Sequence, residues 1–374
     1  PLIKKEYQSQ TAIFINMHDN EKNAFPSWQL NCPVSIPTNA DCVTLAHGEG
    51  GRLSRKLIQE RIVHTLKNDC LLAMNDAAQL PQVKGPLALT TDSFVVSPLF
   101  FPGGDIGSLA VYGTVNDLAV SGARPLWLTL SLIMEEGLPL VILDRVLESI
   151  SEAAQQTGVQ IVTGDTKVVP RGAADGLFIN TAGVGELVEP IPPGAATLKS
   201  GDELIVSGNI GRHGIAVLAV REELGLEPVP FSDCGSLLHP VECLREGMGD
   251  QVRCLRDATR GGVAAVLQEW AEASGMTLSI NERSLPVSPD VRGISELLGL
   301  DPLHIANEGT MVIAVKQGAG AEAVSRLQSL SETVDARVIG VVKPRGIAAV
   351  TVQRTLGAEQ PLDDPLGSPL PRIC

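Results

Sequence analysis

The sequence predicts two mixed α/β domains followed by a flexible C-terminal tail, and three observations support this. Strand-type and helix-type apolar patterns alternate through most of the 374 residues. Proline and glycine interrupt both patterns in "EPIPPGAATLKSGDE" (189–203), which indicates a domain boundary. The last segment, "EQPLDDPLGSPLPRIC", repeats Pro-Leu and ends on Cys374, and its prolines favour an extended arm. A chain of this length is sufficient for two domains with their own cores.

Residues 1–42 lack a clear pattern and are expected to be a poorly ordered leader. The first domain is expected at 43–190, with strands at 87–96, 127–134, 159–167 and 177–187 and helices at 107–123 and 139–157. In the second of these helices, apolar residues from Leu143 to Ala154 recur at helical spacing, and Gly158 is expected to end it.

The second domain is expected at 200–353, and the tail at 354–374. Strands are predicted at 204–208, 276–280, 310–316 and 337–343, and helices at 214–224, 236–246, 262–273, 290–299 and 319–331. Some strands follow one another closely, which favours mixed sheets over wholly parallel ones.

Composition excludes several classes of protein. A net charge of −14 argues against a nucleic-acid binder and against a protein that binds anionic membranes. No apolar run approaches the roughly 18 to 20 residues of a membrane span. Seven cysteines occur without a C-x-x-C pair, so a structural zinc site is not indicated and a reducing cytoplasm is expected.

Several polar stretches of the first domain suit a nucleotide with Mg²⁺. The glycines of "AHGEGGR" (46–52), which are Gly48, Gly50 and Gly51, precede a predicted helix and can curl around an anion. Asp92 lies at a strand end, Asn116 and Asp117 lie on a small-residue helix, and Asp165 and Lys167 follow a strand. Carboxylates are hard ligands for Mg²⁺, and a lysine offers a point charge to a phosphate. Each stretch taken singly also suits an ordinary cap or surface loop.

The second domain adds two candidates. "RDATRGG" (256–262) resembles an anion-binding turn, and "ANEG" (306–309) places Glu308 between a strand end and a glycine. No P-loop, no G-x-S-x-G motif and no histidine-rich metal motif is present.

These stretches, in this order, resemble the HypE family of hydrogenase maturation factors, within the aminoimidazole-ribonucleotide-synthetase-like ATP-binding superfamily. The resemblance covers about Val43 to Cys374 and is carried by these motifs: "AHGEGG", "TDSFVVSPLFFPGGDIG", "GTVNDLAVSGA", "TGDTKVV", "DATRGG", "ANEG" and the terminal "PRIC". It implies an enzyme that uses ATP and Mg²⁺ to dehydrate an S-carbamoyl group on its terminal cysteine to a thiocyanate. It also implies a HypF-like carbamoyltransferase as donor, a HypC–HypD complex as cyano acceptor, and a homodimer.

The resemblance assigns roles to individual residues. Cys374, Glu308 and Lys167 are expected to be catalytic, with Glu308 transferring protons. The metal is expected at Asp92, Asp117 and Asp165. The nucleotide is expected to be bound by those three carboxylates together with Gly48, Gly50, Gly51, Asn116 and Lys167. Asp257, Thr259 and Arg260 are interpreted as structural or phosphate-facing.

Two alternative functions stay open at this point. One is an ATP-dependent synthetase or kinase that acts on a free small molecule, and the other is a non-catalytic carrier of the carbamoyl or cyano group. Glu49 departs from the family pattern, because a carboxylate beside a triphosphate would repel it unless it points away or meets Mg²⁺.

Overall fold

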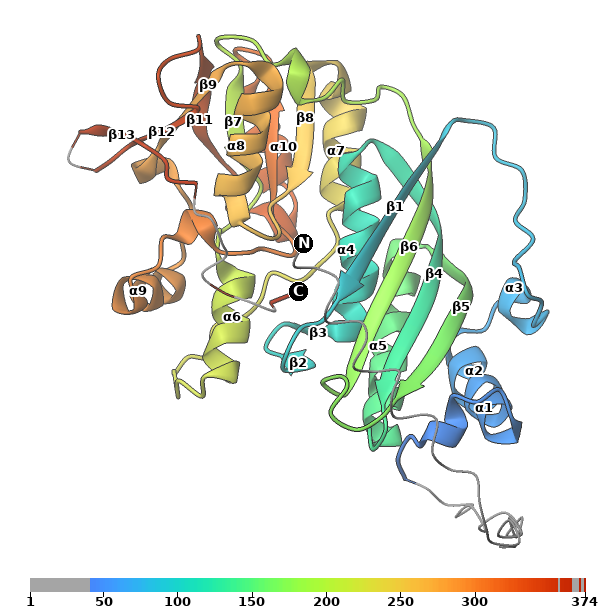
Figure 1. Ribbon diagram of the computed structural model, residues 1–374. Coiled ribbons are helices and arrows are strands. Elements are labelled where there is room, and N and C mark those ends of the chain that lie inside the picture. Colours follow the sequence, from blue (N-terminus) through green and yellow to red (C-terminus); the bar gives the residue numbers. More distant parts are fainter. Residues whose placement is uncertain (1–40, 356, 365–369, 371–372) are drawn as a thin grey trace, which may run out of the picture. The chain divides into compact units, whose positions relative to one another are not determined.

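The structure is a computed structural model that describes residues 41–355, 357–364, 370 and 373–374. The predicted leader falls outside the described residues except for Asp41 and Cys42. Two α/β domains with mixed sheets follow, as the sequence predicted (Figure 1). In the described part of the chain, none of the helices is both long and apolar enough to span a bilayer.

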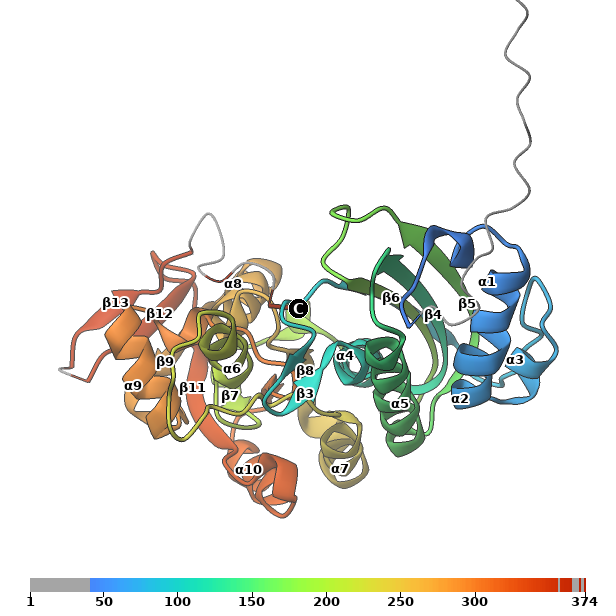
Figure 2. The ribbon, with the colours of Figure 1, turned by 90° about the horizontal axis from the view of Figure 1, so that it is seen from below.

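The first domain is built on a four-stranded sheet in the order β1-β6-β4-β5. Its strands are β1 (Leu87–Phe94), β4 (Ala123–Glu135), β5 (Gln160–Val169) and β6 (Leu177–Leu187). β6 pairs antiparallel with β1 and β4, and β4 pairs parallel with β5. The helices α4 (Ile106–Val120) and α5 (Leu140–Thr157) pack together, and α4 covers one face of the sheet (Figure 2).

Local sequence explains these two helices. The Asp105 side chain caps α4 by accepting hydrogen bonds from the N–H groups of Gly107 and Ser108. α4 is buried on nearly all sides, which explains its lack of an apolar stripe. The apolar face predicted for α5, from Leu143 to Ala154, is buried as expected.

A helical run lies beside the β5 edge of the sheet (Figure 2). It comprises η1 (Leu45–His47), α1 (Arg52–Leu57), η2 (Ile58–Val63), α2 (His64–Leu66) and α3 (Asp69–Leu72). A short hairpin of β2 (Phe100–Phe101) and β3 (Gly104–Asp105) precedes α4.

The second domain has a seven-stranded sheet in the order β13-β12-β9-β11-β7-β10-β8. Its strands are β7 (Glu203–Val206), β8 (Val252–Asp257), β9 (Thr277–Asn281), β10 (Met311–Val315), β11 (Arg337–Lys343), β12 (Val350–Gln353) and β13 (Glu359–Pro361). Its helices are α6 (Arg212–Arg221), α7 (Leu238–Met248), α8 (Gly262–Ser274), α9 (Pro289–Leu298) and α10 (Gly320–Gln328). Short 3₁₀ turns complete it: η3 (Ala195–Thr197), η4 (Gly249–Gln251), η5 (Glu282–Ser284), η6 (Pro302–His304) and η7 (Ser331–Thr333).

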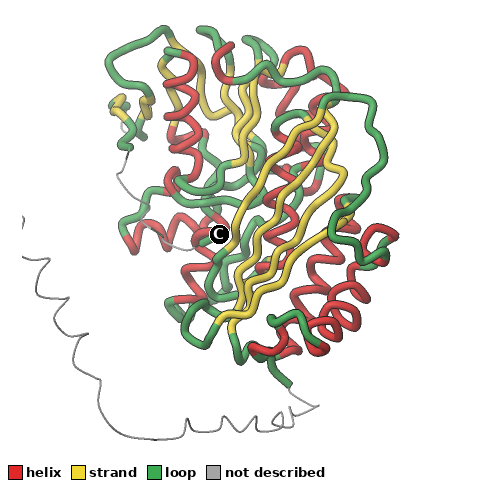
Figure 3. Tube along the Cα trace, turned by 45° about the vertical axis from the view of Figure 1, so that its right-hand side comes forward, coloured by secondary structure: helices red, strands yellow, loops and turns green. Residues whose placement is uncertain are grey.

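Both faces of this sheet are covered. Leu204 and Val206 of β7 pack in the cluster with α8, and Ile205 between them packs in the cluster with α7 and α10. This alternation follows from the two-residue period of a strand. β10 is buried along its whole length, because its two faces meet these two clusters. Figure 3 shows the strands of the sheets in yellow with red helices packed beside them.

Parts of the segment expected to be a mobile tail are packed against the folded chain in this structure. Residues 359–361 form β13 on β12, where the Glu359 carboxylate accepts hydrogen bonds from Thr351 and Lys343. Leu370 and Ile373 are buried. The free energy gained by burying these apolar side chains offsets the conformational entropy that the tail loses when it packs. Composition alone cannot predict the surface on which they are buried.

Candidate active site

Acidic side chains from both domains converge where α4 meets the second domain. β1 provides Asp92, α4 provides Asp117, β8 ends at Asp257, and the loop before β10 provides Glu308. Thr90 donates a 2.8 Å hydrogen bond to Asp117, and the Arg260 guanidinium lies 3.9 Å from Asp92. We call Asp92, Asp117, Asp257 and Glu308 the acidic cluster.

Burial raises the pKa of every member of the acidic cluster, and repulsion between carboxylates adds to it at Asp92, Asp257 and Glu308. Burial is the first cause at Asp92 and Asp117, and the charge of Asp117 adds to the effect at Asp92. Burial and then Asp117 raise the pKa of Asp257 to about 7. Burial, followed by the charges of Asp257 and Asp233, holds the pKa of Glu308 well above its ordinary value.

Glu308 is the most enclosed of these groups. Its side chain is 3% exposed, and its Oε1 atom has no hydrogen-bond partner. Its backbone is fixed, because the Asp233 carboxylate accepts hydrogen bonds from the N–H groups of Glu308 and Gly309. A buried carboxyl oxygen without a partner is suited to meet a bound group, since leaving it unpaired has a free-energy cost.

The C-terminal cysteine lies in the same place. The backbone N–H of Val95, just after β1, donates to the carbonyl oxygen of Cys374. Burial, and then the charge of Glu308, raise the pKa of the Cys374 thiol to about 12, while Arg260 acts in the opposite direction. The sequence left the resting position of the tail undetermined, and in this structure its end lies within the acidic cluster.

Asn116 has a different surrounding from the one expected of a nucleotide ligand. It is 1% exposed, and its amide oxygen accepts a 2.7 Å hydrogen bond from the N–H of Leu237. Its amide nitrogen donates to the carbonyl oxygens of Gly235 and Glu308. The Asn116 side chain therefore ties α4 to the segments that carry Asp233 and Glu308.

Asp165 does not join the acidic cluster within one chain, contrary to expectation. The strand register aligns Asp165 with Ser131, Ser131 with Asn180, and Asn180 with Ser93. Residues in register share a face, so Asp165 lies on the face opposite Asp92 and three strand spacings away, roughly 14 Å. Sequence reasoning missed this because it placed both residues at strand ends without knowing the strand order.

Lys167 lies on the same face of β5 as Asp165, and the glycine loop packs at the β5 edge of the sheet. The Lys167 ammonium is 2.6 Å from the Asp165 carboxylate, and this hydrogen bond is the first cause that lowers the pKa of Asp165. A Cβ on Gly48 would lie 2.9 Å from the Val168 side chain of β5, so the loop packs against this strand. Gly50 and Gly51 have open space around them, and Glu49 is exposed.

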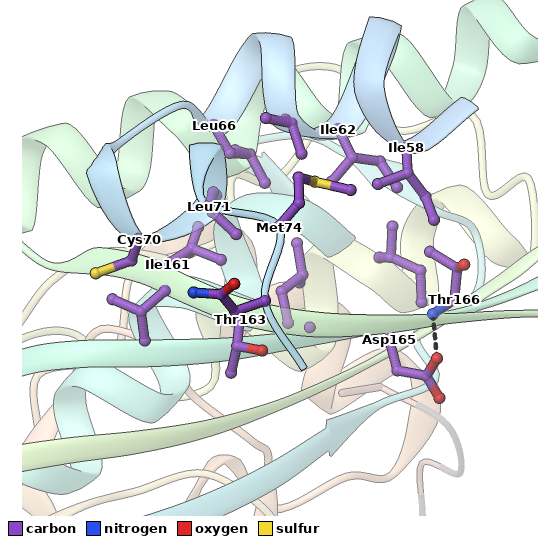
Figure 4. Close-up of a pocket in the computed structure, with 16 residues that line it drawn as sticks. Ile58, Ile62, Leu66, Cys70, Leu71, Met74, Ile161, Thr163, Asp165 and Thr166 are labelled. Carbon is purple, nitrogen blue, oxygen red and sulfur yellow. Dashed lines mark hydrogen bonds between the residues drawn. The ribbon is translucent and has the colours of Figure 1, made fainter. Parts of the chain in front are cut away.

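A cavity of about 200 Å³ opens beside this second group (Figure 4). The helical run lines it with Ile58 and Ile62, Met74 lies just after α3, and Asp165 and Thr166 lie at one end. Its size and mostly apolar lining suit a flat aromatic ring, and neither Glu308 nor Cys374 borders it.

The carboxylates can be tested as ligands for Mg²⁺. Among the described residues, no three histidine, cysteine, aspartate or glutamate side chains are grouped closely enough to hold a metal ion. Asp92 and Asp117 nevertheless fit a cation that takes its other ligands from phosphates and water, as Mg²⁺ usually does. Burial raises the pKa of both carboxyl groups, so a cation beside them would favour the ionised form that binds metal.

Comparison with known proteins agrees with the fold and the motifs. Residues 74–187 match the N-terminal domain of the AIR synthase related protein family, and residues 199–353 match its C-terminal domain. Carbamoyl dehydratase HypE of Escherichia coli K12 is 48% identical over 337 residues, which cover 89% of this chain and 99% of the relative.

Two solved structures are similar as well. A crystal structure of the hydrogenase maturation protein HypE in complex with ATP has a TM-score of 0.84 at 43% identity and covers 88% of this chain and 99% of that one. A HypE–HypF complex has a TM-score of 0.72 at 44% identity and covers 83% and 99%. The chain therefore belongs to the carbamoyl dehydratase HypE family of AIR synthase related proteins.

Proposed function

We propose that the protein uses ATP to dehydrate an S-carbamoyl group on its own Cys374 to a thiocyanate. The observation that carries this proposal is the burial of the Cys374 thiol beside Glu308 and Asp92. A group attached to that sulfur would lie among a buried carboxyl, several carboxylates and the Arg260 guanidinium. A mere carrier has no need of such a site at the end of its own tail.

The reaction balances as follows. The carbamoyl oxygen attacks the terminal phosphorus of ATP and releases ADP, so the oxygen becomes part of a phosphate ester. The C–O bond then breaks, phosphate leaves with that oxygen, and the nitrogen loses two protons as the carbon–nitrogen triple bond forms. Glu308 accepts one of these protons, because a carboxylate of raised pKa is a stronger base than an ordinary one, and the departing phosphate carries the other.

Other residues of the chain bind and orient the phosphates. Asp92 and Asp117 would hold Mg²⁺, which neutralises phosphate charge when bound. Arg260 is 75% exposed and turned toward Asp92, which suits a phosphate contact. Asn116 positions the Glu308 backbone and need not touch the nucleotide.

We propose further that the protein acts as a homodimer. The face of the first sheet that carries Asp165 also exposes Leu87, Leu89 and Ile133, an apolar surface suited to a second copy. A second copy placed on this face beside β1, the edge strand that carries Asp92, would bring its own glycine loop, Asp165 and Lys167 toward the acidic cluster. Both halves of the predicted nucleotide site would then meet, with the cavity of Figure 4 receiving the adenine.

Mixing two inactive variants tests this dimer. Lys167→Met and Glu308→Gln should each be inactive alone. Heterodimers formed by mixing them carry one intact site each, so about a quarter of wild-type activity should return. A return of no activity, with exchange of subunits demonstrated, would contradict a shared site.

The expected partners are a HypF-like carbamoyltransferase as donor and a HypC–HypD complex as cyano acceptor. The solved HypE–HypF complex supports the first of these. A cytoplasmic location is expected, and the six cysteines among the described residues are free thiols in keeping with it.

Intact-protein mass spectrometry tests the reaction. The protein is incubated with the carbamoyl-transferring partner, carbamoyl phosphate and Mg²⁺-ATP, and Cys374→Ala serves as control. A carbamoyl adduct that loses one water only with hydrolysable ATP is expected. An adduct that never loses water would indicate a carrier, and ATP use without an adduct would indicate a small-molecule synthetase.

A further inference from the structure

His213, on the first turn of α6, lies at the point where the C-terminal tail is held. It is completely buried, and its Nε2 atom lies 2.9 Å from the carbonyl oxygen of Ile373, next to Cys374. A carbonyl oxygen can only accept, so Nε2 carries the proton and donates it.

The rest of the imidazole is fixed by its neighbours. Nδ1 lies 2.9 Å from the hydroxyl of Ser232, and that hydroxyl also accepts a hydrogen bond from the N–H of Cys234. The hydroxyl proton therefore points to Nδ1, which selects the neutral tautomer with its proton on Nε2. The ring of Phe101 packs edge-on against His213 at 5.2 Å between centroids.

The hairpin of the first domain supports Ser232 in turn. Gly103 has φ +93°, and a Cβ there would lie 2.7 Å from the Ser232 carbonyl oxygen. The Ser232 N–H donates to the carbonyl of Pro102. The imidazole is thus held between both domains.

The same turn of α6 receives the apolar part of the tail. A Cβ on Gly214 would lie 3.3 Å from a methyl of Leu370 and 2.5 Å from Ile305, so only glycine lets these side chains approach. Leu370 and Ile373 are both buried.

This turn is also bonded to the segment that carries Glu308. The N–H of Gly211 donates a 2.6 Å hydrogen bond to the Asn307 side chain, and the N–H of Gly214 donates to the carbonyl of Ala306. One helical turn therefore holds the tail on one side and the Glu308 segment on the other.

We propose that His213 is a positioning residue that latches the tail with Cys374 beside Glu308. The inference rests on the proposed function, in which the tail must leave to receive a carbamoyl group and return to be dehydrated. A tighter hold on the tail favours dehydration, because the thiol stays beside Glu308, and opposes carbamoylation, because the thiol must reach the partner. The hydrogen bond goes to the backbone of Ile373, so it is independent of the group attached to sulfur.

Alkylation of Cys374 by iodoacetamide measures the undocked tail directly and needs no catalysis. In the 374-residue chain, His213→Leu introduces an apolar side chain of similar volume but removes the Nε2–H hydrogen-bond donor. Loss of a buried hydrogen bond and exposure of an unpaired carbonyl should raise the Cys374 alkylation rate by about tenfold or more. Peptide mass spectrometry reports Cys70 and Cys243 of the same sample as internal references.

Three further variants separate positioning from folding. His213→Gln retains an N–H donor and should restore much of the protection. Ser232→Ala removes the hydroxyl that selects the tautomer and should raise the alkylation rate. His239→Leu is the matched control, because His239 is exposed on α7 and bonded to Glu332.

The catalytic readout is a split between the two half-reactions. His213→Leu should slow water loss from the carbamoylated protein while leaving carbamoylation by the partner as fast or faster. Wild-type alkylation and water-loss rates in folded His213→Leu would overturn the latch. If that variant does not fold, an unchanged alkylation rate in Ser232→Ala overturns it. A wild-type protein that never loses water would refute the proposed function, while the alkylation result still decides the latch.

Discussion

Replacement of Glu308 by glutamine should abolish dehydration without harming the fold. The side chain is 3% exposed, and its Oε1 atom has no partner, so the isosteric amide fills the same volume. Glutamine carries no charge to repel Asp257 and Asp233. We therefore expect the melting temperature to stay the same or rise.

Activity should move in the opposite direction. An amide cannot accept the proton, and a positioned acid–base group contributes roughly 10² to 10⁴ in rate. This corresponds to about 3 to 5.5 kcal/mol in the activation free energy. The assay is single-turnover water loss, followed by mass spectrometry, from protein that already carries the carbamoyl group, so the partner does not limit the rate.

The pH dependence gives a second check. A base must be ionised to act, so a raised pKa moves the rise in rate to higher pH than the ordinary value for glutamate. Glu308→Gln should lack that rise. Glu332→Gln, at an exposed glutamate in η7, is the matched control. Water loss from Glu308→Gln at a rate within threefold of wild type would refute the role of Glu308.

Three further predictions concern the same site. The alkylation rate of Cys374 should rise between pH 9 and about 12, because the docked thiol has a pKa of about 12 while the undocked thiol loses its proton near pH 9. Docking of the tail is therefore strongest below pH 9 and weakens by up to tenfold per pH unit above it. An alkylation rate that reaches a plateau at pH 9 would contradict this. Asn116→Ala should lower the free energy of unfolding, measured by urea denaturation, by about 3 kcal/mol, because the N–H of Leu237 and two carbonyl groups lose their hydrogen-bond partner. A change below about 1 kcal/mol would mean that water replaces the amide. Asp92→Asn should raise the melting temperature of the ligand-free protein, since it removes repulsion with Asp117. It should also lose the extra stabilisation that Mg²⁺-ATP gives the wild type. A wild-type increase in melting temperature with Mg²⁺-ATP, measured by calorimetry, would remove Asp92 from the metal site.

The sequence was sufficient for most of the helices and strands, because their apolar periods are local, but β8, β12 and β13 were not predicted. The alternation along β7 and the buried stripe of α5 follow directly from such periods. It also identified candidate side chains for the chemistry, since Asp92, Asp117 and Glu308 all occur in short motifs. The terminal Cys374 required no fold to be noticed.

Only the tertiary structure decided which of these groups meet. Strand order and register separate Asp165 and Lys167 from Asp92, and neither property is encoded in a single strand. Burial that raises the pKa of Glu308, and the imidazole of His213 that holds the tail, both arise from packing between segments far apart in the chain. The sequence by itself therefore determined the candidate reactive groups of this protein. Long-range packing decided their distances, their pKa values and the resting place of the thiol, because those depend on which faces are buried against each other.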